Sequence, residues 1–90
     1  MPDTRPALPQ ETAVALVYNG STAAVLMASP FDLTDLVRGF ARSEGIVDKA
    51  SQITDPQVIA HPNGFESRAR IPDNRATQLD ARRRATVGPV

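Results

Sequence analysis

The 90-residue chain contains no cysteine and no tryptophan, and it has only one tyrosine and three phenylalanines. The lack of cysteine excludes disulfide bonds, thiolate metal sites and cysteine nucleophiles within these residues. Because aromatic side chains bury the most area, a core built on valine, leucine, isoleucine and alanine gains less free energy per residue. A chain this short forms one domain at most, and we expect marginal stability if it is alone.

Neither sign of charge dominates, since ten basic and ten acidic residues give a formal net charge of zero. The distribution is uneven, because residues 66–90 hold six arginines against three acidic residues. No global charge attracts nucleic acid or an anionic membrane. There is also no run of roughly 18 apolar residues that could span a membrane, and no signal-peptide segment. We therefore expect a cytoplasmic protein with neither nucleic acid nor membrane as a partner.

Residues 11–46 are the best-specified part of the sequence. Two apolar runs flank Asn19-Gly20, the dipeptide that best satisfies the two positive φ angles of a type I′ turn. This pattern predicts a β-hairpin with strands at residues 12–18 and 21–28.

The hairpin is apolar on both of its expected faces. Two-residue closure pairs Tyr18 with Ser21, Leu16 with Ala23 and Val14 with Val25. One face then carries Val14, Leu16, Tyr18, Val25 and Met27, and the other carries Ala13, Ala15, Val17, Thr22, Ala24 and Leu26. Strands of this kind are normally covered on both sides. One helix can cover one face, so the second face implies a further layer from a partner subunit or from more polypeptide. The alternative is that small alanines tolerate exposure.

A helix is predicted directly after the hairpin. Ser29 is a good N-cap, Pro30 suits the first helical position, and Asp32 places a carboxylate in the first turn. An apolar stripe at helical spacing follows, formed by Leu33, Leu36, Val37 and Phe40. Gly45 offers a stop, and Gly39 inside the helix suggests that another backbone packs closely there.

The second half of the sequence predicts two more strands and a second helix. After a polar connection at residues 47–55, residues 57–61 form a short edge strand between prolines, and a turn follows at residues 62–64. Residues 65–71 then alternate, with Phe65, Ser67, Ala69 and Ile71 on one side and Glu66, Arg68 and Arg70 on the other. The last helix covers residues 74–85. The order ββαββα predicts an α+β unit with helices laid on a mostly antiparallel sheet.

The densest charge feature is the run Arg82, Arg83 and Arg84 near the end of the last helix. Guanidiniums there could hold a phosphate or pyrophosphate by forked hydrogen bonds. The simpler interpretation is that solvated cations complement the negative end of the helix dipole. Three consecutive residues also point in three directions around a helix, so they cannot all meet one ligand while the helix is intact.

No other residues form a catalytic constellation. His61 is the only histidine, and we interpret it as a solvated strand end, because no spacing marks a triad or metal site around it. Asp32, Asp35 and Glu44 belong to the solvated surface of the first helix. The glycines of residues 39–45 lack the spacing of a phosphate-binding loop.

Two segments carry a family resemblance: ETAVALVYNG at residues 11–20 and VLMASPFDLTDLVRGFARSEGIV at residues 25–47. They closely resemble the N-terminal part of the formate dehydrogenase accessory sulfurtransferase family (FdhD/NarQ). The likeness continues more loosely through Asn63-Gly64 to the arginine run and covers about residues 11–88. It implies a longer complete protein, a likeness to cytidine deaminase-like folds, and a homodimer. It also implies transfer of sulfur from a cysteine desulfurase to the molybdenum cofactor (molybdopterin guanine dinucleotide), which activates formate dehydrogenase.

One departure from the family pattern is decisive for function. In the family, a C-x-x-C loop follows the arginine-rich helix and carries the persulfide, which requires a thiolate of low pKa. Here the sequence reads RRRATVGPV and contains no cysteine. We therefore expect a lead-in at residues 1–10 and a partial FdhD-like domain at residues 11–88, truncated before that loop. No catalytic residue carries over, no metal site is expected, and the fragment is expected to bind no cofactor and to be inactive alone.

Three hypotheses follow from the sequence. The first is an N-terminal fragment of a formate dehydrogenase accessory protein, in which Arg82, Arg83 and Arg84 border the sulfur-transfer loop and contact the anionic cofactor. The second is a non-catalytic interaction or dimerisation module that uses the apolar second face of the hairpin. The third, an anion or nucleic-acid binder acting through the arginines, is the weakest because the net charge is zero.

Overall fold

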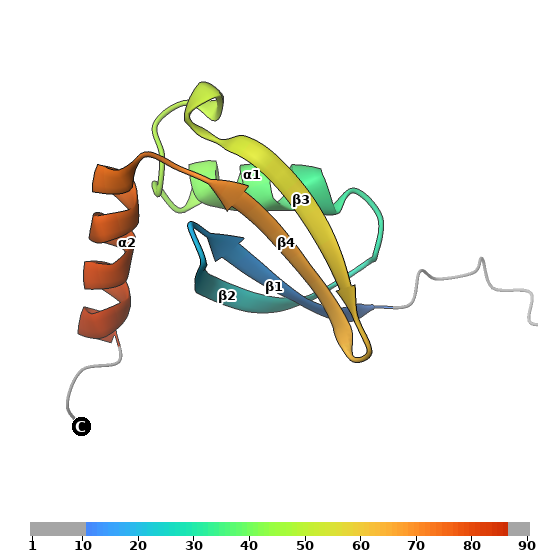
Figure 1. Ribbon diagram of the computed structural model, residues 1–90. Helices are drawn as coiled ribbons and strands as arrows, with labels where there is room; N and C mark the ends of the chain where they lie inside the picture. Colours follow the sequence, from blue (N-terminus) through green and yellow to red (C-terminus); the bar gives the residue numbers. More distant parts are fainter. Residues whose placement is uncertain (1–10, 87–90) are drawn as a thin grey trace, which may run out of the picture.

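The computed structural model describes residues 11–86, with side chains through Arg82, and the expected lead-in at residues 1–10 lies outside this range. Its elements follow the order ββαββα with one short 3-10 helix inserted (Figure 1): β1 Thr12–Tyr18, β2 Ser21–Ala28, α1 Leu33–Ser43, η1 Ala50–Gln52, β3 Thr54–His61, β4 Gly64–Arg70 and α2 Asp73–Thr86. The four strands form one sheet in the order β2-β1-β4-β3. The predicted α+β class is confirmed.

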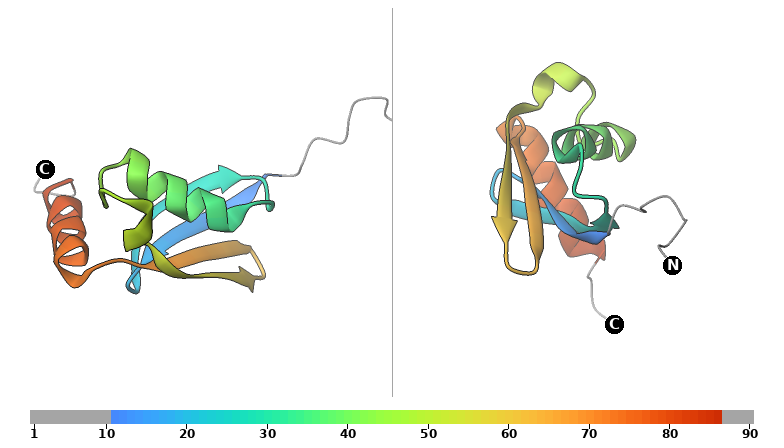
Figure 2. Two further views of the ribbon diagram at one scale, coloured as in Figure 1. Left: turned by 90° about the horizontal axis from the view of Figure 1, so that it is seen from above. Right: turned by 90° about the vertical axis from the view of Figure 1, so that its right-hand side faces the viewer.

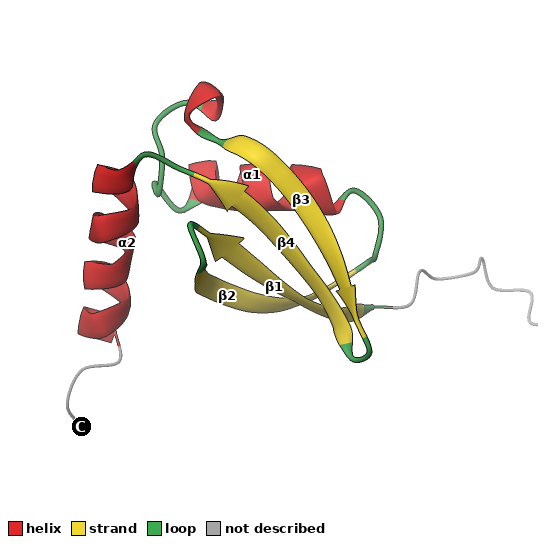
Figure 3. Ribbon diagram, in the orientation of Figure 1, coloured by secondary structure: helices red, strands yellow, loops and turns green. Residues whose placement is uncertain are grey.

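The sheet is mixed, because the two hairpins adjoin through a pair of parallel strands. β1 pairs with β2 and β3 pairs with β4 in antiparallel fashion, whereas the central neighbours β1 and β4 run parallel. The sheet is thus mostly antiparallel, as predicted, but the parallel junction was not anticipated. Helix α1 lies along one face of the sheet, and α2 stands at one end of it (Figures 2 and 3).

The hairpin forms at the predicted residues, but its predicted register is wrong. Tyr18 faces Ser21 as expected, yet a bulge at Ala23 shifts the pairing, so that Leu16 faces Ala24 and Val14 faces Leu26. One extra residue in a strand reverses which side chains point to each face.

This bulge exchanges the faces of β2. Leu26 and Ala28, rather than Val25 and Met27, pack toward the core beside β1. Val25 and Met27 are 64% and 62% exposed on the opposite face. Their predicted place beside the buried residues of β1 is therefore wrong.

The predicted start of the first helix is also wrong. Ser29 accepts a hydrogen bond from the Phe31 N–H at 3.4 Å in a bend, and α1 begins only at Leu33. Asp32 is the N-cap residue, with a left-handed φ of 58° and no side-chain cap. Asp tolerates this conformation, which turns the chain sharply from β2 onto the sheet.

The remainder of α1 follows the prediction except at Gly39. Its buried residues are Leu33, Val37 and Ala41, with Leu36 and Phe40 partly buried against the same core. Gly45, with a φ of 69°, ends the helix as expected. The predicted close packing at Gly39 is not found in the described part of the chain, where nothing lies within 4 Å of the position that a Cβ would take.

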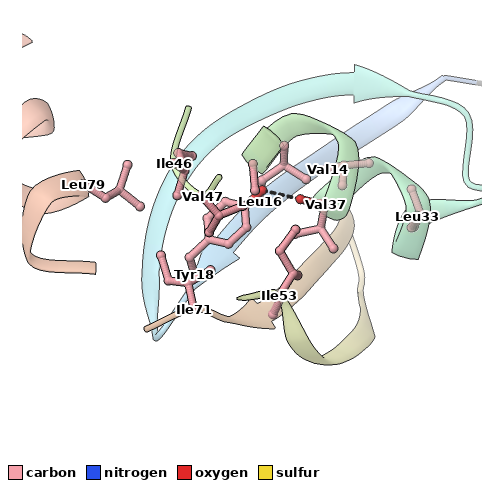
Figure 4. Packing of buried hydrophobic residues seen from close by; sticks show 12 residues of the cluster. Val14, Leu16, Tyr18, Leu33, Val37, Ile46, Val47, Ile53, Ile71 and Leu79 are labelled. Atoms are coloured by element: carbon pink, nitrogen blue, oxygen red, sulfur yellow. Dashed lines mark hydrogen bonds between the residues drawn. The ribbon is translucent and has the colours of Figure 1, made fainter. Parts of the chain in front are cut away.

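Two buried hydroxyl groups fix α1 on the sheet. The Tyr18 hydroxyl on β1 donates to the carbonyl oxygen of Val37 at 2.6 Å, inside the apolar cluster shown in Figure 4. Ser67 on the neighbouring strand donates to the carbonyl of Leu33 at 2.5 Å. The two carbonyls are four residues apart and thus one helical turn apart. Burial raises the pKa of Tyr18, so its neutral, donating form is retained in the core.

The second hairpin matches the prediction in its turn and in β4. β3 is longer than predicted, since it begins at Thr54 and tolerates Pro56 next to an irregularity in its pairing, as an edge strand can. The preceding connection is less polar than predicted, because Val47 and Ile53 are buried in the core cluster.

Asn19 connects the first hairpin turn to the start of α2. Its side chain accepts a hydrogen bond from the Ile71 N–H at 2.8 Å and donates to the Ile71 carbonyl at 2.9 Å. Its backbone N–H donates to the Ala69 carbonyl at 3.1 Å. Because α2 begins two residues after Ile71, this turn residue also positions the second helix.

Candidate functional site

The predicted arginine site lies on the last turns of α2, and Arg82 is the member whose side chain the structure describes. Its Nη1 donates to the backbone carbonyl of Glu44 at 3.0 Å, and its Nη2 lies 3.9 Å from a carboxylate oxygen of the same residue. Glu44 is the C-cap of α1. Arg82 therefore contacts the negative end of another helix, which accounts for its charge without a ligand. The side chains of Arg83 and Arg84 lie outside the described residues, so their predicted anion contact stays a prediction.

One face of α2 holds the helix against the segment that follows α1. Arg75, Leu79 and Arg82 have the spacing i, i+4 and i+7 and so share this face. Arg75 is ion-paired with Asp48, and Leu79 is buried in the core cluster. The arginines at positions 75 and 82 thus support the placement of the helix.

A polar recess of about 240 Å³ lies near the hairpin turn, lined in part by Asp55, Arg68 and Arg70. Arg68 is already within 3.6 Å of a Glu66 carboxylate oxygen. The other two charged groups that line the recess are the guanidinium of Arg70 and the carboxylate of Asp55, which have opposite charges. This balance of charge does not fit a pyrophosphate, which needs several unopposed donors.

His61 has a partner that the sequence interpretation missed. Its Nε2 lies 2.5 Å from a carboxylate oxygen of Glu66. The two-residue turn at Pro62-Asn63 makes these side chains diagonal neighbours across the hairpin, and that spacing was the available signal. His61 is exposed at the end of its strand, as predicted. An exposed pair of this kind contributes little to stability.

The sheet face opposite α1 carries a pair of exposed apolar side chains. Val25 and Met27 project from β2, beside Ala13 and Ala15 of β1. A shallow, mainly apolar depression of about 180 Å³ runs from Val25 and the two alanines to His61 and Glu66. Among the described elements, no helix lies over this part of the sheet (Figure 2). We call the area formed by Ala13, Ala15, Val25 and Met27 the outer face.

Neither metal ligation nor membrane insertion finds support in residues 11–86. In this range, no three histidine, aspartate or glutamate side chains gather closely enough to hold a metal ion. Neither of the two helices described there is long and apolar enough to cross a membrane. The candidate functional features are therefore the α2 face and the outer face.

Comparison with known proteins places these features in a family. A profile of the FdhD/NarQ family matches residues 9–89. The sulfur carrier protein FdhD of Agrobacterium fabrum is 44% identical over 84 residues, which cover 93% of this chain and 31% of that protein. The chain thus spans about a third of the length of the curated relative that it matches. Because the profile covers nearly all of its residues, the chain belongs to the FdhD/NarQ family.

Proposed function

We propose that this chain is the scaffold portion of a sulfurtransferase-type accessory protein. The observation that carries the proposal is a family match over nearly the whole chain in a sequence without any cysteine. Persulfide transfer requires a thiolate, so these 90 residues cannot carry the sulfur themselves. Their role is to hold other parts of the sulfur-transfer machinery in place.

The complete machinery, in this proposal, takes sulfur from a cysteine desulfurase and delivers it to the molybdenum cofactor of formate dehydrogenase in the cytoplasm. The relative's description as a sulfur carrier protein supports the sulfur-handling part. The likeness to cytidine deaminase-like domains and the homodimer belong to the same proposal. The recess near Arg70 gives no support for cofactor binding by the described residues, so an anion contact rests on the side chains of Arg83 and Arg84.

The contribution of α2 is positional. In the family pattern, the sulfur-transfer loop follows the arginine-rich helix. The burial of Leu79 and the contacts of Arg75 and Arg82 fix α2 relative to the end of α1. A loop that follows α2 would therefore start from a defined position, which is what preorganised transfer chemistry needs.

A chimera tests this proposal. The 84 matched residues of the Agrobacterium fabrum relative are replaced by the corresponding residues of this chain, and the product is expressed in a bacterium that lacks its own FdhD gene. We expect the chimera to restore formate dehydrogenase activity and the 90-residue chain alone to restore none. A folded chimera without activity, or activity from the 90-residue chain alone, would contradict the proposal.

The exposed Val25 and Met27 favour a second candidate function, a module that associates through the outer face. This function needs no sulfur chemistry. Light scattering of the 90-residue chain tests self-association through that face.

A further inference from the structure

The outer face combines features that an exposed sheet surface normally avoids. Val25 and Met27 are the two most exposed large apolar side chains of the sheet, at 64% and 62%. They stand beside Ala13 and Ala15, whose short side chains line the shallow depression. A folded protein keeps such contiguous apolar area mainly where another surface covers it.

The topology of the sheet supports the same conclusion independently. β1 is a central strand, bonded to β2 on one side and in parallel to β4 on the other. Sheets of parallel strands are normally covered on both faces, and their strands read as continuous apolar runs, as β1 does from Ala13 to Tyr18. Helix α1 covers the face of Val14 and Leu16, which are fully buried. On the other face, Val17 is buried near the hairpin turn, and the half with Ala13 and Ala15 is open.

The open half also has the layout of a small interface. Its centre is apolar, and the His61–Glu66 pair lies at the side of the depression on the second hairpin. An apolar centre beside a polar rim is typical of surfaces that bind protein. Small alanines allow close approach of a helix or a second sheet, which would cover Val25 and Met27.

We propose that the outer face is the docking surface for the polypeptide that makes up the unmatched part of FdhD/NarQ family proteins. The aligned residues are 93% of this chain but only 31% of the relative, so more than two-thirds of that protein is additional polypeptide. It belongs to the same polypeptide as the matched part of that relative and is therefore present in equal amount to cover an exposed apolar face. With the opposite face occupied by α1, the outer face is the part of the described sheet where exposed apolar side chains adjoin one another. The proposal rests on family membership and not on sulfur transfer, so the two can fail separately.

Oxidation of Met27 measures the coverage directly. Peroxide converts exposed methionine to the sulfoxide at a rate that follows its accessibility. The 90-residue chain and the chimera described above are treated with peroxide under native conditions, and oxidation of the Met27 peptide is quantified by mass spectrometry. We expect Met27 to react about tenfold more slowly in the chimera than in the 90-residue chain. Equal rates in a folded chimera would overturn the proposal.

A pair of valine substitutions provides the matched control. Val25→Lys alters the outer face, and Val58→Lys alters an exposed valine of β3, another edge strand, on the α1 side of the sheet. In the 90-residue chain both variants should melt close to the parent, since edge strands accommodate lysine. In the chimera, only Val25→Lys should lower the melting temperature, by about 5 °C or more, because it buries a charge. Equal effects of the two variants in the chimera would contradict the proposal.

Two further measurements keep the test decisive. If the chimera does not fold, the lysine substitution is made in the native Agrobacterium relative at the position that aligns with Val25, and an unchanged melting temperature there overturns the proposal. The second measurement is light scattering of the 90-residue chain over a range of concentrations. A dimer whose formation protects Met27 would identify a second copy as the occupant and would also overturn the proposal.

Discussion

The change of Gly64 to alanine is the sharpest test of the parallel junction between β1 and β4. Gly64 begins β4 opposite Ala13 and has a φ of 157°, a conformation that side chains rarely adopt. A Cβ on this residue would overlap the carbonyl oxygen of Ala13, at less than the 3.0 Å below which real Cβ atoms are essentially never found. The overlapping atom belongs to the backbone, so a change of side-chain rotamer cannot relieve the contact.

The expected loss of stability has two sources. Overpacking costs about 1–3 kcal/mol, and strained backbone at a non-glycine residue costs about 1–3 kcal/mol more. Because partial movement of β4 away from β1 relieves both, we expect Gly64→Ala to lower the free energy of unfolding by about 2–4 kcal/mol. That is a large part of the total for a small domain.

Gly39→Ala is the matched control, since the chemical change is the same and the surroundings differ. Among residues 11–86, the added methyl group meets nothing within 4 Å on the exposed side of α1. Alanine is the better helix former and loses less conformational entropy on folding. The free energy of unfolding should therefore rise by about 0.5–1 kcal/mol.

Urea denaturation followed by far-UV circular dichroism measures both variants, because the chain has no tryptophan for fluorescence. With an unchanged m-value, the midpoint should move down for Gly64→Ala and up for Gly39→Ala. A Gly64→Ala protein within about 0.5 kcal/mol of the parent would refute the close approach of β1 and β4 and, with it, the register of the sheet.

Three other predictions concern the polar contacts. Tyr18→Phe should cost about 1–2 kcal/mol by removing the buried hydrogen bond to Val37. Since burial raises the pKa of Tyr18 above its ordinary 10.0, the parent should lose stability as the pH rises above 10, and Tyr18→Phe should flatten that slope in denaturation curves. Asn19→Asp keeps the turn but loses the donor to the Ile71 carbonyl, so its melting temperature should fall by about 4–8 °C. An unchanged melting temperature would refute a stabilising role for this hydrogen bond. Arg82→Ala should cost less than about 1 kcal/mol in urea titrations, because the contact with Glu44 is exposed, and a larger loss would contradict a solvent-screened pair.

The local elements were predictable because their signals are local. The Asn19-Gly20 pair placed both strands of the first hairpin, and Gly45 ended α1 as expected. The bulge at Ala23 was not predictable, because an alanine fits a bulge or a regular strand equally well. The shifted register packs Leu26, partly buried, against the core in place of the two side chains assigned to that face.

The pairing of β1 with β4 and the position of the α1 start could be predicted only indirectly from the sequence. No local pattern in residues 64–70 indicates that this strand runs parallel to β1. The junction includes a close approach of the Gly64 backbone to the carbonyl of Ala13, which is distant in the sequence. The start of α1 was misplaced for a similar reason. Ser29 and Pro30 form a good capping pattern, but the crossover from β2 to the sheet requires the left-handed turn at Asp32 first.

The apolar character of both hairpin faces was predicted correctly even though the register was wrong. The prediction gave this face Ala13 and Ala15 from β1, and the structure agrees, but it exchanged the residues of β2. Both registers leave apolar side chains on both sides of the hairpin, because β2 is apolar at consecutive positions from Ala23 to Ala28. The prediction of a second covering layer therefore did not depend on the register. The identity of the residues that would contact such a layer did depend on the register. The bulge makes them Val25 and Met27, the largest apolar side chains of the outer face.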